Sequence, residues 1–456
     1  MAIFIDILRK QSRCVIMILL VLATGCAVVK KPYVTSSYYH KTTEELYKAN
    51  EKTITNTGGF KAGFSKVNLV PGEKVFEGKI PIAGFGQLKT KYSTGIHDSI
   101  YVRAVALSTG TDTLVIVSAD MLIMPPDIAD TVIKILSGSR IKRRQIFFSA
   151  THTHSGIGGW GHGKLAKLMA GKPDKKLKQY FSERIVFAIE TAISDIKPAR
   201  LGSGSFHEPG FIRNRLTGES STINDAFDYL VIEQPGSRRC ILGTYSAHAT
   251  TIGSKNTLLS GDYPGMWSEA MEHDFADLAL FCGGSMGGQA PVSPGEIYEG
   301  AEIIGKSLAD SILNGVKEIN LNDQVVVNSI SLPLSLPKYR MRISKNRSLP
   351  TFVSKSLMAS PKNVFLQALR INNMIWFFTP CDFNGEYALM LKRLYSGKGY
   401  NVAVSGYNGS YIGYIIPGKY YFIDHSEART MSWFGPSMGE YMFEMMDRMA
   451  GKLIDY

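Results

Sequence analysis

Short apolar runs alternate with helical hydrophobic patterns along most of the chain beyond residue 60. Hydrophobic residues recur at helical spacing over 128–136, directly behind Pro125-Pro126, and again over 177–192 and 297–312. Strands that alternate with amphipathic helices predict an α/β architecture. We find no internal repeat in the sequence. Six runs have the length that is typical of buried strands, at 114–118, 145–150, 240–247, 278–282, 374–379 and 401–405.

The residues that follow these six runs are rich in side chains that bind ligands or protons. In α/β sheets, ligands bind in the crevice outside the carboxyl ends of the strands, where the loops converge. We therefore expect one large catalytic domain, with mixed sheets flanked by helices and its functional site at the strand carboxyl ends. The residues concerned are Asp120, His152, His154, His248, Gly283, Gly284, Gly287, Gly288, Asp382, Asn408, Tyr411 and Tyr414.

Two histidines and a carboxylate make a metal site one interpretation of these positions. His152 and His154 lie at i and i+2 on an extended segment, so they point the same way. One could bind a metal while the other contacts substrate, although a hydrogen-bonded surface pair has the same spacing. His248 adds a second nitrogen ligand and Asp382 an anionic oxygen. Three protein ligands and one open position are typical of catalytic zinc, so the residues alone indicate a metallohydrolase.

Composition narrows the class of protein. The 456 residues are 45% hydrophobic and 20% charged, which argues against disorder and against a protein that spans the membrane many times. The formal net charge of +12 favours approach to an anionic surface, whether nucleic acid or acidic lipid. No nucleic-acid-binding motif is present, so we expect no nucleic-acid partner.

The N-terminus predicts export and lipid attachment. Arg9, Lys10 and Arg13 precede a short apolar run over 14–23, which is too short to span a bilayer comfortably. The run ends in Leu-Ala-Thr-Gly-Cys over 22–26, which resembles a lipobox with Cys26 as the lipidated residue. Ordinary cleavage and release of the chain is the alternative. We expect a lipoprotein signal peptide over 1–25, a polar tether over 26–60 and the catalytic domain over 61–456.

The remaining cysteines and one basic segment add less. Cys240, Cys282 and Cys381 form neither a disulfide framework nor a CxxC metal pair. The segment 338–362 is basic and interrupts the α/β pattern. It is either a solvated loop or a membrane-facing collar that helps the protein to meet a substrate in the bilayer.

A series of motifs resembles those of the neutral ceramidases. The segment Ser149–Gly156 resembles the family signature ATHTHSGPG. Its order relative to the other motifs agrees with the family from about residue 65 to about residue 445. The other matching segments are Val117–Asp120 (VSxD), Ala83–Gly86 (a glycine-rich entry), Asn214-Arg215 (NRS), Ser246–His248, Gly261–Gly265, and the tyrosine-rich stretch from Tyr411 to Pro436.

The resemblance implies a zinc ion held by His152, His248, Asp382 and Tyr414. The family carries a glutamate in a PGE motif where this chain has Asp382 after Pro380-Cys381, and Glu386 is a second possible ligand. His154 and Arg215 match family residues that contact the substrate head group and stabilise the oxyanion, and Tyr414 belongs to the same catalytic group.

One position departs from the family. A serine in a GDVSP motif is essential there, and the aligned loop here is Gly287-Gly288-Gln289-Ala290-Pro291. Ser285 and Ser293 lie close by and are possible substitutes. Loss of a nucleophile would abolish activity, whereas loss of one hydrogen-bond donor typically costs about 10²–10³ in rate. The otherwise complete set of zinc ligands favours the second reading.

We therefore expect a lipid-anchored hydrolase that faces the periplasm or the cell surface. It would bind an N-acyl sphingoid lipid and split the amide bond of ceramide, or of a related N-acyl lipid, into a fatty acid and a sphingoid base. One alternative is hydrolysis of another amide or N-acyl lipid, because the loop with Ala290 is altered. The other is a catalytically impaired lipoprotein that only binds lipid.

Overall fold

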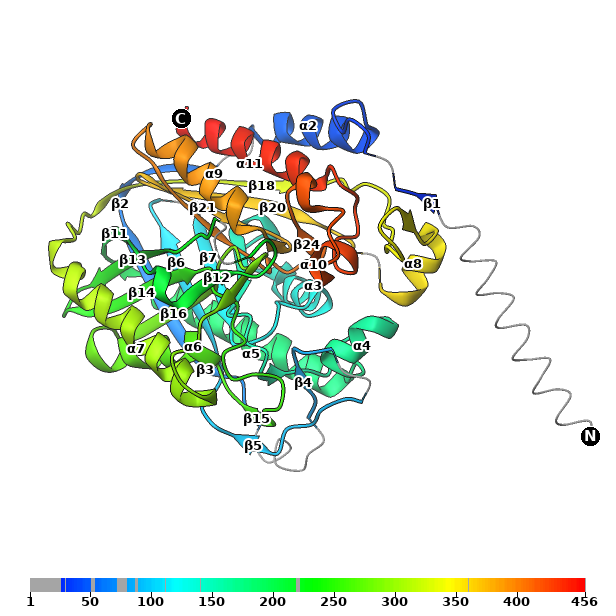
Figure 1. Ribbon diagram of the computed structural model, residues 1–456. Helices are drawn as coiled ribbons and strands as arrows, with labels where there is room; N and C mark the ends of the chain where they lie inside the picture. The colour runs from blue at the N-terminus through cyan, green and yellow to red at the C-terminus, as the bar shows by residue number, and fades with distance from the viewer. Residues whose placement is uncertain are drawn as a thin grey trace, which may run out of the picture.

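Three mixed β-sheets enclose a common core, and helices cover their outer faces (Figure 1). The computed structural model describes residues 26–28, 30–50, 54–71, 80–86, 89–110, 112–139, 141–218, 222–359 and 361–455. The expected signal peptide over 1–25 lies outside these residues. Among the described residues, no helix combines the length and the hydrophobicity that crossing a membrane requires.

The first sheet has the strand order β10-β3-β6-β7-β8, in which only the β7–β8 pair is parallel. Helix α3 leads from β7 to β8, and α5 packs on β3 and β6. The elements are β3 (Lys61–Asn68), β6 (Tyr101–Ser108), β7 (Thr113–Ala119), α3 (Pro126–Ile135), β8 (Ile146–Ala150), α5 (Lys175–Ser194) and β10 (Lys197–Pro198).

The second sheet has the order β11-β13-β14-β16, and again only its last pair, β14–β16, is parallel. Helix α6 connects these two strands and packs on β16, while α7 packs on α6. The elements are β11 (Arg200–His207), β13 (Ala226–Gln234), β14 (Arg238–Tyr245), α6 (Asp262–Asp274), β16 (Leu278–Gly283) and α7 (Ile297–Gly315).

The third sheet has the order β2-β18-β20-β21-β23 and ends in the parallel pair β21–β23. Helices α2 and α11 lie side by side over it at the top of Figure 1. The elements are α2 (Ser37–Asn50), β2 (Ile54–Gly59), β18 (Gln324–Pro333), β20 (Phe365–Ile371), β21 (Met374–Phe378), α9 (Gly385–Ser396), β23 (Asn401–Ser405) and α11 (Met438–Ile454).

Within the described ranges, five short strand pairs and three short helices lie around the sheets. They are β1 (Cys26–Ala27) with β19 (Arg347–Ser348), β4 (Ile82–Ala83) with β9 (Gly156–Ile157), β5 (Gly95–Ile96) with β15 (Leu258–Leu259), β12 (Ile212–Asn214) with β17 (Gln289–Pro291), β22 (Asp382–Phe383) with β24 (Tyr414–Ile415), α4 (Lys164–Ala170), α8 (Thr351–Leu357) and α10 (Ser426–Arg429).

The three sheets repeat one order of elements. Each unit runs through an antiparallel meander of three strands, a connecting helix, a fourth strand parallel to the third, and a long helix. This structural repetition has no counterpart in the sequence, in which we find no internal repeat. The repetition lies in the order and packing of elements rather than in residue identity, because any apolar side chain of suitable volume fills a core position.

The carboxyl ends of the three parallel pairs meet at the centre of the molecule. Side chains from all three sheets, including Phe147, Leu280 and Trp376, share one buried core. Polar bonds also join the pairs: Ser118 Oγ donates to the carbonyl of Phe281 at 2.5 Å, and Ser149 Oγ to that of Gly406 at 3.1 Å. The six strands of these pairs are those that the apolar runs predict, and helices α3, α5 and α7 are confirmed as well.

Two expected loops are structured. The segment 26–60 is not a simple tether, because α2 packs between β18 and α11 and the hydroxyl of Tyr39 donates to Glu444 at 2.6 Å. Leu46 is fully buried there. The basic segment 338–362 contains β19 and α8. Spacing of Tyr38, Thr42 and Leu46 by four residues gives α2 an inward face, which its polar composition concealed.

Leu46→Ala should lower the free energy of unfolding by about 2–5 kcal/mol, because it removes a fully buried side chain and leaves a cavity. Urea unfolding followed by circular dichroism measures this change. Lys41→Ala, on the exposed side of the same helix, should stay within about 0.5 kcal/mol of the parent. Equal stability of Leu46→Ala and the parent would mean that α2 does not dock in solution.

Candidate metal centre and apolar cavity

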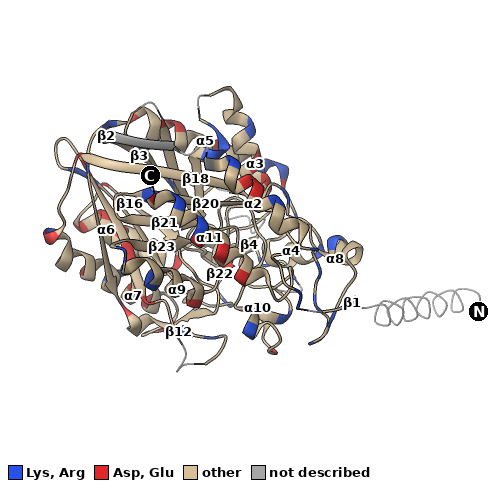
Figure 2. Ribbon diagram, turned by 90° about the horizontal axis from the view of Figure 1, so that it is seen from above, with Lys and Arg blue, Asp and Glu red and all other residues tan. Residues whose placement is uncertain are grey.

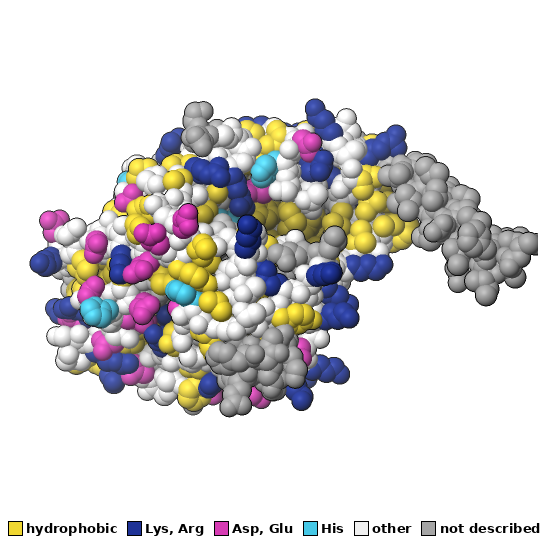
Figure 3. Space-filling model, turned by 60° about the horizontal axis from the view of Figure 1, so that its bottom comes forward, with side chains coloured by type: hydrophobic (Ala, Val, Ile, Leu, Met, Phe, Trp, Pro, Cys, Tyr) yellow, Lys and Arg dark blue, Asp and Glu magenta, His cyan; other side chains and the backbone are white. Residues whose placement is uncertain are grey.

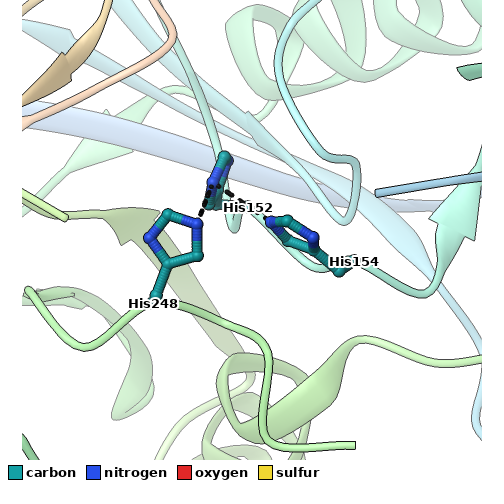
Figure 4. Close-up of side chains that lie close together, drawn as sticks. All are labelled: His152, His154 and His248. Atoms are coloured by element: carbon teal, nitrogen blue, oxygen red, sulfur yellow. Dashed lines mark hydrogen bonds between the residues drawn. The ribbon is translucent and has the colours of Figure 1, made fainter. Parts of the chain in front are cut away.

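His152 and His248 face each other from two different sheets. His152 follows β8, His248 follows β14, and their Nε2 atoms are 2.9 Å apart (Figure 4). His154 Nε2 lies 3.4 Å from His152 Nε2. The ligand atoms of the three histidines lie within 4.8 Å of one another. Two nitrogens bound to one zinc ion at 2.0–2.1 Å with tetrahedral angles lie about 3.3 Å apart, so the pair is spaced for a shared ion.

The backbone around His152 fixes the ring and its tautomer. His152 adopts a left-handed conformation with φ of 64°, which turns the chain sharply at the end of β8. Its Nδ1 donates to the carbonyl of Leu122 at 2.5 Å. Nε2 therefore carries the lone pair that points into the cluster. Histidines that bind metals commonly donate their other ring nitrogen to a backbone carbonyl in this way.

Asp382 completes the cluster from the third sheet. One carboxylate oxygen lies 3.4 Å from His152 Nε2. The hydroxyl of Tyr407 donates to Oδ1 at 2.8 Å and that of Tyr411 to Oδ2 at 2.7 Å. The Tyr407 ring also stacks on His152, with centroids 4.3 Å apart. Burial raises the pKa of Asp382 to about 6, although the two tyrosine hydrogen bonds partly oppose this effect.

Tyr414, Arg215 and Glu427 form the side of the site next to His248. The β22–β24 pair sets Tyr414 opposite Asp382, and Tyr414 Oη lies 3.2 Å from Arg215 Nη2. The same guanidinium nitrogen lies 3.3 Å from His248 Nδ1. Glu427, which is buried, accepts from Arg215 Nε at 2.5 Å and from the Gly288 amide at 2.8 Å. Glu427 thus fixes Arg215 relative to the loop that contains Ala290.

Burial keeps the histidines uncharged. It lowers the pKa of His152 to about 3 and moves the pKa values of His154 and His248 well below the usual range, with Arg215 adding to the effect. Neutral imidazole is the form that binds metals. The lone pair of His152, a second imidazole 2.9 Å away and an anionic carboxylate together make a donor set that fits a divalent transition metal.

The structure brings together His152, His154, His248, Asp382, Arg215 and Tyr414, as the sequence predicts. Glu386, the second possible ligand, instead pairs with Lys419. Tyr407 and Glu427 were missed. Tyr407 follows the apolar run 401–405, as Tyr411 does, and this position after a predicted strand could have identified it as a site residue. Glu427 lies on α10, and no apolar run or spacing marks it.

The loop 287–290 supports the site from behind. The Gly287 amide donates to the carbonyl of Phe383 at 3.0 Å, and the Gln289 side chain bonds the carbonyls of Ser246 and Ser285. Ala290 is buried opposite Arg213 in the β12–β17 pair. Ser285 Oγ is buried against Asn224 and Ser246, whereas Ser293 is exposed and bonds Gly295. Neither serine lines the cavity described next, and no residue of the loop 287–290 lines it either.

A cavity of about 620 Å³ opens above the cluster. Its polar lining includes His152, His154, Arg215 and Tyr414. Most of the remaining wall is apolar, and Figure 3 shows a hollow of hydrophobic side chains bordered by Lys and Arg. This size and composition suit a ligand with a long hydrocarbon part and one polar group at its inner end. The apolar wall includes Leu122, Ile123, Trp160, Met169, Met358, Met431 and Trp433.

Fold and site together define an α/β protein with a buried histidine cluster compatible with a metal. Comparison with known proteins gives a more specific result. A sequence model described as "Neutral/alkaline non-lysosomal ceramidase, N-terminal" matches residues 72–285. The neutral ceramidase of Pseudomonas aeruginosa is 25% identical over 222 residues, which cover 44% of this chain and 32% of that protein. The matched segment therefore spans about a third of the length of this curated relative.

Solved structures extend the likeness to most of the chain. The crystal structure of neutral ceramidase from Pseudomonas aeruginosa superposes with a TM-score of 0.75 at 19% identity, covering 87% of this chain and 75% of that one. A ceramidase complexed with C2 gives the same TM-score and coverage at 18% identity. Residues 72–285 thus match the neutral ceramidase family in sequence, and most of the chain has the fold of a neutral ceramidase.

Metal affinity should depend on pH through Asp382. Its carboxyl is protonated below about pH 6 and must lose that proton to bind a metal, so affinity falls as the pH falls. Below pH 6, the slope of log affinity against pH should increase by about one, because one proton must leave Asp382 for each metal ion bound. His152 adds nothing to this slope, since it stays neutral down to about pH 3. Calorimetric titration with zinc at a series of pH values measures the slope.

In the control Asp382→Asn, zinc binding should be weaker and this steepening should be absent. A steepening by two or three protons that starts near pH 6.5, as for ordinary exposed histidines, would contradict the assignment.

Proposed function

We propose that this protein is a zinc-dependent hydrolase of the amide bond of ceramide or a related N-acyl lipid. The observation that supports this most directly is the cluster of His152, His248 and Asp382, of which His152 lines an apolar cavity. A metal donor set beside a hydrocarbon-binding wall suits a lipid whose reactive group is polar. The family and the fold agree with this chemistry.

His152, His248, Asp382 and Tyr414 would hold the zinc ion. Nitrogen and carboxylate donors are those that zinc prefers in catalytic sites. When bound, zinc polarises a carbonyl oxygen and lowers the pKa of a coordinated water. Tyr407 and Tyr411 hold both oxygens of Asp382, so the carboxylate cannot rotate away from the histidines.

Arg215 and His154 would act on the substrate. Arg215 lines the cavity and keeps its positive charge beside Tyr414, where negative charge develops on the amide oxygen during attack. Its ion pair with the buried Glu427 holds the guanidinium in place. His154 also lines the cavity. Its neutral ring can orient the amide by a hydrogen bond without adding a charge. The apolar wall excludes water and would bind the acyl and sphingoid chains.

Ala290 would reduce the rate without removing the reaction. The loop before it is anchored at Gly288, whose amide bonds Glu427 and whose carbonyl accepts from the Arg215 amide at 2.8 Å. A hydroxyl at position 290 would therefore be held in a fixed position relative to Arg215.

The purified protein should contain about one zinc ion per chain and hydrolyse short-chain ceramide slowly. Ala290→Ser should raise turnover about tenfold or more, within the range for one hydrogen bond to a developing oxyanion. His152→Ala should abolish both zinc binding and turnover, with or without serine at position 290. Metal analysis and fatty-acid release provide the two measurements.

His207→Ala serves as the matched control, because His207 is exposed on β11 and should change neither quantity. Bound zinc without ceramide hydrolysis by either protein would indicate another amide substrate. Absence of both zinc and activity would leave only a lipid-binding protein.

Export and lipidation at Cys26 form a separate part of the proposal. The charged and apolar leader and the small residues before Cys26 support it. Cys26 is a free cysteine at the start of β1. Cys26→Ser should release the protein from the membrane fraction when that fraction is washed with high salt. Cys381→Ser, at a buried cysteine between β21 and β22, should leave it there. Retention of Cys26→Ser after the wash would contradict lipid attachment.

A further inference from the structure

The described N-terminal end lies against the rim of the apolar cavity. Cys26 pairs with Ser348 in the β1–β19 ladder, and the Val28 amide donates to the Asn346 carbonyl at 3.0 Å. Helix α8 follows β19 directly and packs on α4. We call this continuous surface the mouth face and define it as residues 26–28, 30–31, 163–170 and 345–359. Figure 1 shows β1 and α8 at the right edge of the molecule, with α4 below them.

The mouth face is part of the cavity wall as well as part of the outer surface. Ala166 and Met169 of α4 and Met358 and Ala359 after α8 line the cavity. The backbone of Gly163 approaches Met358 and Ala359 so closely that a Cβ atom there would meet both at 2.9 Å. The two helices are therefore held together at the opening through which a ligand enters.

The exposed charges of the mouth face are all positive. It has seven basic residues and no acidic residue, whereas the whole chain has 39 acidic and 51 basic residues, a ratio that would give about five acidic residues here. In the ribbon of Figure 2, segments coloured blue for Lys and Arg lie around β1 and α8. The seven residues are all exposed: Lys30, Lys31, Lys164, Lys167, Lys345, Arg347 and Lys355.

Large apolar side chains project among these charges. Phe352 on α8 is 75% exposed, which is the largest value among the exposed large hydrophobic residues of the described chain, and Leu168 on α4 is 36% exposed. Exposed apolar groups surrounded by lysines are typical of surfaces that insert into the head-group region of an anionic bilayer. Transfer of an exposed phenylalanine side chain from water into that region lowers the free energy.

We propose that the mouth face docks onto an anionic lipid bilayer and directs the cavity opening toward it. The lipid expected on Cys26 projects from this same face, so the anchor and the cavity opening face the same membrane. A ligand then passes from the bilayer along the cavity wall that α4 and the segment after α8 line, without crossing water. The docking surface rests on charge, exposure and position, and it does not depend on the amidase reaction.

Binding of the full-length chain to vesicles tests this surface. Cys26→Ser serves as the parent, so that no attached lipid contributes, and any binding by the leader is common to all variants. Vesicles of phosphatidylcholine with phosphatidylglycerol are compared with pure phosphatidylcholine vesicles by sedimentation, and none contains ceramide. The parent should prefer the anionic vesicles, and added salt should weaken this preference.

The test variant adds Phe352→Ser, Lys355→Gln and Lys167→Gln to the parent. Each lysine near an anionic surface contributes about fivefold to binding, so the variant should bind anionic vesicles at least about 25-fold more weakly. The matched control adds Phe187→Ser, Lys317→Gln and Lys61→Gln, which are exposed positions on other elements. It should bind like the parent.

Single variants guard against a loss of folding. Lys345→Gln and Lys355→Gln should each weaken binding about fivefold while the thermal unfolding temperature stays that of the parent. Equal binding of the test variant and the parent, an equal loss in the control, or no preference for anionic vesicles would each overturn the proposal. Because no substrate is present, failure here is distinct from failure of the amidase assay.

Discussion

The meeting of three parallel strand pairs at their carboxyl ends is the constraint on which the rest of this molecule depends. Each sheet alone supplies only part of a site: His152 comes from the first, His248 from the second and Asp382 from the third. The shared core of the three sheets holds these ends together, and bonds such as that from Ser149 to Gly406 set their spacing. Because close-packed cores resist displacement, the ligand atoms keep their mutual distances.

Such a cluster is costly in a protein interior, and the surrounding residues limit that cost. Burial would penalise charged imidazoles and an isolated carboxylate. The histidines stay neutral, and Asp382 accepts hydrogen bonds from two tyrosine hydroxyls. Arg215 keeps its charge because the buried Glu427 pairs with it. The balance leaves unshared nitrogen and oxygen donors directed at one point, which is the condition a divalent ion satisfies.

The cavity that leads to the histidine cluster is mostly apolar, and the surface around its opening is basic. The cavity wall changes from His152 and Arg215 at the inner end to Met169 and Met358 at the rim. The outer surfaces of α4 and α8 continue this wall into the mouth face. The polar inner end of the cavity, its apolar wall and the basic mouth face are thus continuous. They suit, in turn, a polar head group, a hydrocarbon chain and a charged surface.

The sequence by itself determined the six central strands, three of the helices and six of the residues that meet at the site: His152, His154, His248, Asp382, Arg215 and Tyr414. Period and length of apolar runs specify strands directly, and the residues that follow strand ends are local features of the chain. The tertiary structure decided the contacts between residues far apart in sequence, which a local sequence pattern does not specify. The threefold order of elements depends on which strands pair, and the docking of α2 depends on Leu46 finding the third sheet. Glu427 and Tyr407 acquire roles only because Arg215 and Asp382, far away in sequence, are brought beside them. The position of Cys26 at the cavity rim likewise follows from pairing with Ser348, a contact between residues more than 300 apart.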